Sequence, residues 1–220
     1  MRRIFQKVLK ICVHPLHLLK SACYCSLVFI MLLPASASAA PLTPLEGLER
    51  LRLALQGLQD FSAELTQEKQ VSVLKKKLVM KGTVRFMKPD RFAMELFPPY
   101  KSRMLLKNNL LLQRIGERGE LQKIILPEDQ GLSQWIGKLS KPVSSLPEGM
   151  EIKAEETGRV TTVMIRPAGS GQMKEITVQF QDDGLIRRLV LEERNGDRST
   201  MIFGKARKNS GLTDADFRME

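Results

Sequence analysis

Residues 82–96 read Gly-Thr-Val-Arg-Phe-Met-Lys-Pro-Asp-Arg-Phe-Ala-Met-Glu-Leu, and this stretch decides the fold class. Apolar side chains alternate with more polar ones on both sides of a central corner, at Val84, Phe86, Phe92, Met94 and Leu96. An alternation of period two is typical of strands with one apolar face. Pro89 has no N–H to give to a neighbouring strand and Asp90 favours turns, so the corner separates two antiparallel strands.

The same alternation recurs outward from this stretch along most of the chain. Turn signals separate the alternating segments about every 8 to 12 residues, and Asp-Gly and Asn-Gly pairs are strong hairpin signals. Besides the strand that ends at Leu96, strands are predicted at Phe61–Gln70, Leu78–Met87, Lys101–Lys107, Leu110–Ile115, Leu121–Leu126, Met150–Glu156, Val160–Arg166, Glu175–Phe180, Leu185–Glu193 and Ser199–Ala206. We therefore expect a mainly β fold with about eleven antiparallel strands.

Two segments change to a helical period. Leucines recur at helical spacing between residues 45 and 58, which predicts an amphipathic helix packed on the sheet, with a membrane-surface helix as the alternative. A second, shorter helix is predicted after Pro127, with one apolar face made by Leu132, Trp135, Ile136 and Leu139. In the C-terminal segment 209–217, Leu212 and Phe217 are expected to attach the tail to the body of the protein.

The first 39 residues predict a cleaved secretory signal peptide, so the chain is expected to be exported. Five basic residues and no acidic one precede or flank the apolar run Leu27–Leu33, and Ala37-Ser38-Ala39 is a small-x-small signal for cleavage near Ala39/Ala40. An uncleaved anchor is an alternative, but the run is shorter than the 18 or more apolar residues of a spanning helix. Lipidation at Cys23 is disfavoured because Lys20 stands where that signal has Leu. Residues 40–220 are then one domain.

Cleavage of this leader removes every cysteine and histidine, two residue types that often act in catalysis or bind metals. All three cysteines and both histidines lie inside it, at Cys12, Cys23, Cys25, His14 and His17. The mature chain thus has no zinc site of Cys and His, no nucleophile paired with His and no histidine proton shuttle. Adjacent carboxylate pairs such as Glu155-Glu156 would point to opposite faces of a strand, which does not suit paired acid/base work. We expect neither an enzyme nor a metal site or cofactor.

The charge favours anionic lipid over nucleic acid. Without the leader, 30 Lys and Arg stand against 24 Asp and Glu, so the net charge of +11 falls to +6. An exported protein rarely meets nucleic acid, whereas an anionic membrane surface or headgroup is a suitable partner. A basic surface that serves only solubility is the alternative. An interior lined by Leu, Met and Phe suits acyl chains, but from these residues alone a cavity and a filled core remain equally open.

The chain resembles the LolA family of periplasmic lipoprotein carriers. After the leader and the helix, Phe61-Ser62-Ala63-Glu64-Leu65-Thr66-Gln67 is similar to that family's F-x-A-x-F-x-Q, and Gly82 to Phe92 is similar to its G-x-x-x-F-x-[KR]-P-x-x-F. Gly184-Leu185-Ile186 and Asn209 to Phe217 resemble the later strand and closure of the family. The resemblance implies a half-open antiparallel β-barrel of the LolA and LolB type, covered by a helical lid above an apolar cavity.

The resemblance also implies roles for individual residues. Lys88 falls where the family has an Arg that latches the lid by hydrogen bonds, and because Lys lacks the planar fork of Arg, Arg91 is a possible substitute. The implied lid residues are Leu132, Trp135, Ile136 and Leu139. The implied cavity residues are Val84, Phe86, Phe92, Met94 and Leu96. The usual Asp-Gly and aromatic residues after the fourth strand are replaced by Asn108-Asn109-Leu110, which leaves the cargo open.

We therefore expect a monomeric periplasmic carrier that shields lipoprotein acyl chains between the two membranes of a Gram-negative envelope. The resemblance implies that it accepts lipoproteins from an inner-membrane ABC exporter and passes them to an outer-membrane receptor. One alternative keeps the cavity and changes the cargo to a glycolipid or another outer-membrane lipid. The second is a non-catalytic sensor or scaffold that has a filled core and recognises a partner protein.

Overall fold

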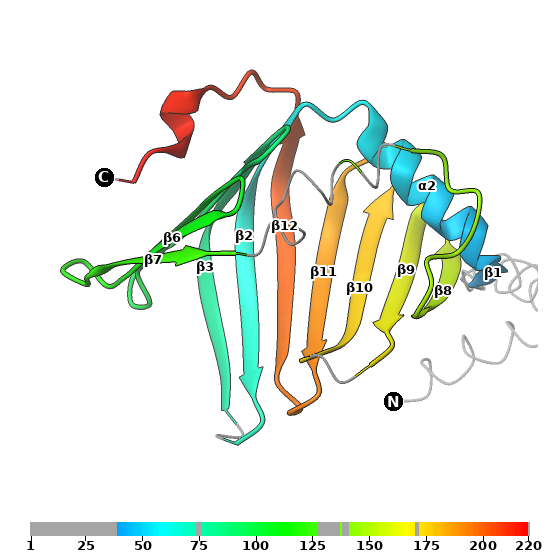
Figure 1. Ribbon diagram of the computed structural model, residues 1–220, viewed down its shortest axis with the longest axis horizontal. Coiled ribbons are helices and arrows are strands. Elements are labelled where there is room, and N and C mark those ends of the chain that lie inside the picture. The colour runs from blue at the N-terminus through cyan, green and yellow to red at the C-terminus, as the bar shows by residue number, and fades with distance from the viewer. Residues whose placement is uncertain (1–38, 74–75, 127–136, 138–140, 170–171, 220) are drawn as a thin grey trace, which may run out of the picture. The chain divides into compact units, whose positions relative to one another are not determined.

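The computed structural model describes residues 39–73, 76–126, 137, 141–169 and 172–219. These residues belong to the unit Ser38–Glu220 and form an antiparallel sheet with a helix, α2, packed on it (Figure 1). No helix in these ranges is long and apolar enough to cross a membrane.

Helix α2 spans Pro44–Gln56, and the sequence explains where it starts. The Thr43 side chain accepts a hydrogen bond from the Glu46 N–H at 3.3 Å, and the Glu46 carboxylate accepts one from the Thr43 N–H at 2.9 Å. This capping box satisfies two N–H groups that the helix itself leaves unpaired, and Pro44 at the first turn needs no N–H partner. The predicted helix at residues 45–58 is confirmed.

The sheet has twelve strands within the described residues, one more than the eleven or so expected. In chain order they are β1 Ala40–Leu42, β2 Asp60–Val71, β3 Lys76–Met87, β4 Arg91–Leu96, β5 Ser102–Lys107, β6 Leu110–Ile115, β7 Leu121–Ile125, β8 Met150–Thr157, β9 Val160–Pro167, β10 Met173–Gln181, β11 Ile186–Glu193 and β12 Arg198–Lys208. In space the order is β1-β8-β9-β10-β11-β12-β2-β3-β4-β5-β6-β7. The extra strand, β1, is too short to show an alternation in the sequence.

The pairing confirms that residues 82–96 form two antiparallel strands, β3 and β4. Ala63 lies opposite Val84, and Val84 lies opposite Met94, so these three share one face of the sheet. Since side chains alternate along a strand, the rest of that face follows from the register. We call the face that carries Val84 and Met94 the apolar face, and the opposite one the polar face.

Helix α2 packs on the apolar face over β8 and β9 (Figure 1). Leu48 and Leu51 of the helix are buried in one cluster with Ile152, Ala154, Val163 and Phe180. A Cβ atom at Gly47 would lie 2.2 Å from the Cβ of Ala154, so the glycine permits the close approach of helix to sheet. The leucine stripe is therefore core, as its helical spacing indicates.

The expected mainly antiparallel β class is confirmed, and β1 and β7 form the two edges of an open sheet. The predicted second helix, with Leu132, Trp135, Ile136 and Leu139, lies outside the described residues. A short 3₁₀ helix, η2, spans Asp214–Phe217 at the end of the chain. Phe217 is buried there, which confirms that it attaches the tail.

Candidate functional site

The five predicted cavity residues all lie on the apolar face of β3 and β4. Phe86 is opposite Phe92, Val84 is opposite Met94, and Leu96 is opposite Gly82. Val84 and Leu96 are buried, whereas Phe86, Phe92 and Met94 are half-buried. The apolar face continues through the partners of these residues on β2 and β5, which include Phe61, Ala63, Met104 and Leu106. The register thus gathers the predicted residues into one apolar surface.

A groove of about 740 Å³ lies at one end of this surface. We call it the proline groove because Pro98 and Pro99 line it, together with Lys69, Leu78, Met80, Leu96, Tyr100, Lys101, Ser102, Gln113, Ile115, Gly116 and Glu117. The register explains its position: β4 ends at Leu96 opposite Gly82, whereas β3 extends six residues further, to Lys76. Beyond this step β3 has no partner in β4, and the segment after β4, with Pro98 and Pro99, lines the groove instead.

Gly82 allows β3 and β4 to come close together beside this step. A Cβ atom on Gly82 would lie 2.0 Å from the backbone oxygen of Glu95, so any larger residue would push the strands apart. Leu96, the predicted cavity residue nearest the groove, is 6% exposed. Among the predicted five, Leu96 therefore links the buried part of the apolar face to the proline groove.

A second groove, of about 630 Å³, lies beside the C-terminal half of α2, and we call it the helix groove. Its apolar lining includes Leu53, Ala54, Leu58 and Phe180. Its rim is charged and is formed by Arg50, Asp182, Asp183 and Lys208. Leu53 is 53% exposed.

Lys88, the predicted latch, contacts the end of α2. Its Nζ donates to the backbone oxygen of Leu55 at 3.1 Å and to that of Gln56 at 3.5 Å. The last four carbonyls of a helix have no partner within the helix, and a cation beside them is also favoured by the helix dipole. Lys88 thus connects the corner between β3 and β4 to α2. The predicted lid segment at Leu132 to Leu139 is outside the described residues, so its contact with Lys88 stays a prediction.

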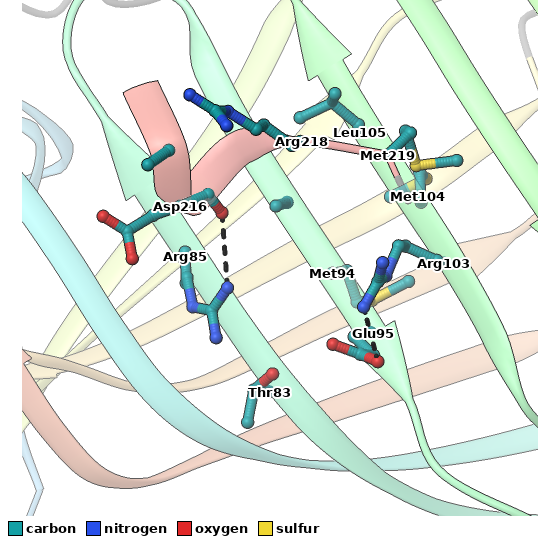
Figure 2. Close-up of a pocket in the computed structure, with 12 residues that line it drawn as sticks. Thr83, Arg85, Met94, Glu95, Arg103, Met104, Leu105, Asp216, Arg218 and Met219 are labelled. Carbon is teal, nitrogen blue, oxygen red and sulfur yellow. Dashed lines mark hydrogen bonds and ion pairs between the residues drawn. The ribbon is translucent and has the colours of Figure 1, made fainter. Parts of the chain in front are cut away.

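Arg91, the proposed substitute for Lys88, contacts a different segment. Its guanidinium forms an ion pair with Asp214 of η2. Arg91 lies on the polar face, because its neighbour in β4, Phe92, lies on the apolar one. Arg85, on the same polar face of β3, donates to the backbone oxygen of Asp216 at 3.2 Å (Figure 2). The structure therefore does not bring Arg91 and Lys88 together: one holds the C-terminal segment and the other holds α2.

A small pocket lies between the C-terminal segment and the polar face of β3, β4 and β5 (Figure 2). Its volume is about 90 Å³, and its polar lining includes Thr83, Arg85, Glu95 and Arg103. Arg103 donates to Glu95 at 3.0 Å (Figure 2). A pocket of this size and polarity does not suit an acyl chain, so the apolar face is the better candidate for the functional surface.

Asp60 holds the C-terminal segment, and the sequence analysis did not predict this role. Its carboxylate accepts hydrogen bonds from the Ser210 N–H at 2.7 Å, the Ser210 hydroxyl at 2.9 Å, and the N–H groups of Gly211 and Leu212 at 2.9 and 3.3 Å. Burial alone raises the pKa of Asp60, but these donors outweigh it and the pKa is lowered. The resemblance of Asn209 to Phe217 to the closure of the LolA family was the available signal for this contact.

Within the described residues, no group of three or more His, Cys, Asp or Glu side chains is arranged to hold a metal ion. The arrangement that remains is an apolar sheet face with a groove at each end. Such a surface binds apolar groups by removing them from water, at about 25 cal/mol for each Å² buried.

Residues 56–220 match the family model of the outer membrane lipoprotein carrier protein LolA. No curated protein matches the chain.

Solved structures resemble the chain only distantly. A LolA superfamily protein from Nitrosomonas europaea shares 12% identity over 81% of this chain and 98% of its own, with a TM-score of 0.43. A putative outer membrane lipoprotein-sorting protein domain from Vibrio parahaemolyticus shares 9% identity over 79% and 95%, with a TM-score of 0.42. The Pseudomonas aeruginosa MucA/MucB complex matches at 12% identity over 81% and 62%, with a TM-score of 0.46. At these values the likenesses do not extend to what those proteins bind.

Proposed function

The chain belongs to the family of the outer membrane lipoprotein carrier protein LolA, and we propose on this basis that it is a periplasmic carrier of lipoproteins. In this proposal, the carrier binds the acyl chains of its cargo against the apolar face and shields them from water. It acts without a covalent step or a cofactor.

The observation that carries the proposal is the continuous apolar surface of β2 to β5, with an open groove at its end. Each methylene that leaves water contributes about 0.8 kcal/mol, so a surface of this kind holds acyl chains without polar contacts to the chains themselves. Half-buried Phe86, Phe92 and Met94 favour this reading, because a fully filled core would bury them.

We propose that the segment with Leu132, Trp135, Ile136 and Leu139 acts as a lid over this surface and that Lys88 holds the covering helices in place. The leader at residues 1–39 would direct the chain to the periplasm. An inner-membrane ABC exporter would load the carrier, and an outer-membrane receptor would unload it. The family match supports the carrying of lipoproteins, and the exporter and the receptor are part of the proposal.

The test is to isolate the protein, expressed from its full coding sequence, from the envelope of its own host and to identify bound molecules by native mass spectrometry. A co-purifying lipoprotein supports the proposal. A bound phospholipid or glycolipid keeps the carrier and changes the cargo. A protein that carries no lipid and takes up no acyl probe, but retains a partner protein, would contradict the carrier and favour a sensor or scaffold.

A further inference from the structure

Lys69 is a cation on the apolar face. It lies opposite Leu78 of β3 and Ser199 of β12, in the same row of alternate residues as Phe61, Ala63, Leu65 and Gln67. It is half-buried, and it lines the proline groove with Leu78 and Met80. No hydrogen bond or close ion pair joins its ammonium to another group in the described part of the chain. Lysine side chains are mostly exposed, so a half-buried lysine on the apolar face calls for an explanation.

The nearby carboxylate of Asp197 does not form a direct ion pair with Lys69, so the ammonium of Lys69 is available to an anionic ligand. The pKa of Asp197 is lowered, first by hydrogen bonds from the Ser72 N–H and hydroxyl and then by the positive charge of Lys69. The Asp197 carboxylate is nevertheless engaged by the Ser72 N–H at 2.9 Å and the Ser72 hydroxyl at 3.0 Å. Lys69 is therefore attracted by Asp197 without being neutralised in a direct pair.

A second cation lies on the rim of the same groove. Lys101 forms an ion pair with Glu117 at 3.0 Å, and both side chains are largely exposed to water, at 45% and 72%. An exposed pair of this kind contributes little to stability, so Lys101 exchanges partners at low cost. The proline groove thus combines an apolar floor of Leu78, Met80 and Ile115 with cations at its rim.

We propose that the proline groove binds an anionic phospholipid, with its headgroup phosphate at Lys69 and its acyl chains along the apolar face. This inference rests on one part of the proposed function, the binding of acyl chains on the apolar face, and it names an anionic phospholipid as a ligand of that same face. A lysine ammonium donates charge-assisted hydrogen bonds to phosphate, while its stem packs on the apolar floor. A zwitterionic or uncharged headgroup gains less from the same position.

The length of the apolar face fits this placement. Phe61 and Lys69 are eight residues apart on β2, which corresponds to about 26 Å at ~3.3 Å per residue. One leaflet of a bilayer is about 15 Å of hydrocarbon, half of the ~30 Å core. Chains that enter at the groove therefore have enough apolar surface before they reach Phe61, Phe86 and Phe92.

The test compares two fluorescent lipids that have identical short acyl chains and are kept below their aggregation concentration: phosphatidylglycerol and phosphatidylcholine. The full-length protein is expected to bind phosphatidylglycerol about tenfold more tightly, because a headgroup with a net negative charge gains more from the Lys69 ammonium than a zwitterionic one does. Lys69→Gln should remove this difference, because it weakens phosphatidylglycerol binding more than the binding of phosphatidylcholine, whose phosphate is already accompanied by its own choline cation. Lys69→Arg should preserve it. Lys153→Gln, an exposed lysine on the polar face of β8, is the matched control and should change neither affinity.

The outcomes separate this inference from the function on which it rests. Equal affinity for both lipids, or a preference that survives Lys69→Gln, overturns the headgroup site and leaves the carrier intact. If neither lipid binds, the headgroup site fails, whereas the lipoprotein carrier fails only if the protein isolated from its host also holds no lipoprotein or other lipid. Binding of glycerophosphate alone, without chains, would identify a free-phosphate site and contradict the lipid. Binding only to phosphatidylglycerol vesicles, with no uptake of single lipids, would replace the groove with a membrane-docking surface.

Discussion

At the scale of single residues, polar groups on this sheet have clearly different tasks. Lys88 closes the end of a helix, Arg91 and Asp60 attach the C-terminal segment, and Lys69 has no close partner among the described residues. Stability explains the polar residues that have hydrogen-bond partners, because a buried polar group without a partner lowers the free energy of unfolding. A half-buried cation beside an open groove is not explained in that way.

Phe92→Glu is expected to abolish lipid binding and to leave the fold intact. The glutamate would place a carboxylate on the apolar face opposite Phe86 and Leu106, where chains are proposed to lie. Since Phe92 is only half-buried, the charge can reach water when no cargo is present, but bound chains would bury it at a cost. We expect a loss of affinity greater than about tenfold in titrations with a fluorescent acyl probe.

The matched control for this prediction is Ile202→Glu, at an apolar residue that is 40% exposed on the polar face of β12. Circular dichroism should report the same secondary structure for both variants. If Phe92→Glu binds and releases the probe as the parent does, the assignment of the apolar face as the cargo surface is wrong.

Asp60→Asn is expected to loosen the C-terminal segment. The amide keeps the shape of the carboxylate but replaces an acceptor with a donor that faces the donors of Ser210 and Gly211. The free energy of unfolding should fall by about 1–3 kcal/mol. Hydrogen exchange at the amides of Ser210, Gly211 and Leu212 should become faster. Asp182→Asn, in an exposed pair with Arg159, is the control and should change neither quantity.

The same contact predicts a pH dependence. Because the pKa of Asp60 is lower in the folded protein than in the unfolded chain, its stabilising effect is fully present above the unfolded value of about 3.9. The effect is lost as the pH falls through the folded pKa. Urea unfolding at a series of pH values should show the gap between the parent and Asp60→Asn closing in this acidic range. A gap that stays constant to the lowest pH would contradict the role of the ionised carboxylate.

At the scale of elements, helix α2 covers one part of the apolar face more closely than any described element covers the rest. Helix α2 packs closely over β8 and β9 through Gly47 and Leu51, while the apolar face of β3 and β4 keeps three half-buried large side chains. Lys88 lies where the two parts meet, since it starts from the β3–β4 corner and reaches the last turn of α2. Movement of α2 relative to β3 would first have to break this contact.

Lys88→Met is expected to free the C-terminal turn of α2. The methionine keeps an unbranched apolar stem of similar size but cannot donate to the Leu55 and Gln56 carbonyls. Because a cation at a helix C-terminus contributes about 0.3–1 kcal/mol, hydrogen exchange in the last turn should be a few-fold faster. Lys88→Arg should restore protection. Unchanged exchange in Lys88→Met would exclude the latch at this helix.

Elements with a strong local pattern could be predicted from the sequence, and those that depend on distant partners could not. The alternation at Val84 and Phe92 indicates a strand with one apolar face, and the leucine spacing between residues 45 and 58 indicates an amphipathic helix, because these signals act within a few residues. Strand β1 is three residues long and forms only because β8 is available to pair with it. Likewise, Asp60 meets Ser210 across 150 positions of sequence, and only the folded sheet brings them together.

The candidate site was predictable to the same extent. The parity of Phe86, Phe92 and Met94 places them on one face, which any antiparallel pairing of β3 and β4 preserves. The sequence did not predict that Lys88 contacts α2 and Arg91 contacts the C-terminal segment. Lys88 lies at a corner, where the alternation of a strand does not apply and the turn decides the direction of the side chain. The proline groove was missed for a similar reason: it arises from unequal strand lengths, which the sequence signals only through Pro98 and Pro99.

At the scale of the whole molecule, a carrier must hold its cargo and also release it. Several acyl chains at about 0.8 kcal/mol for each buried methylene would bind too tightly for exchange, unless opening the protein costs a comparable free energy. Such a cost arises when covering helices have to separate from the sheet to admit the chains, which they then cover. The segment with Leu132, Trp135, Ile136 and Leu139 is proposed to supply this cover, and its single tryptophan offers a direct measurement.

Trp135, the single tryptophan of the sequence, is expected to report cargo binding through its fluorescence. If the apolar face of its predicted helix lies on acyl chains in the loaded protein, a saturating non-fluorescent phosphatidylglycerol should shift its emission to shorter wavelength, because the indole ring then has apolar neighbours. The ligand should also raise the free energy of unfolding by about 2.7 kcal/mol at a hundredfold excess over Kd. Trp135→Phe should lose the optical signal and keep the stabilisation. Stabilisation of the parent without any change in emission would mean that this segment does not contact the cargo.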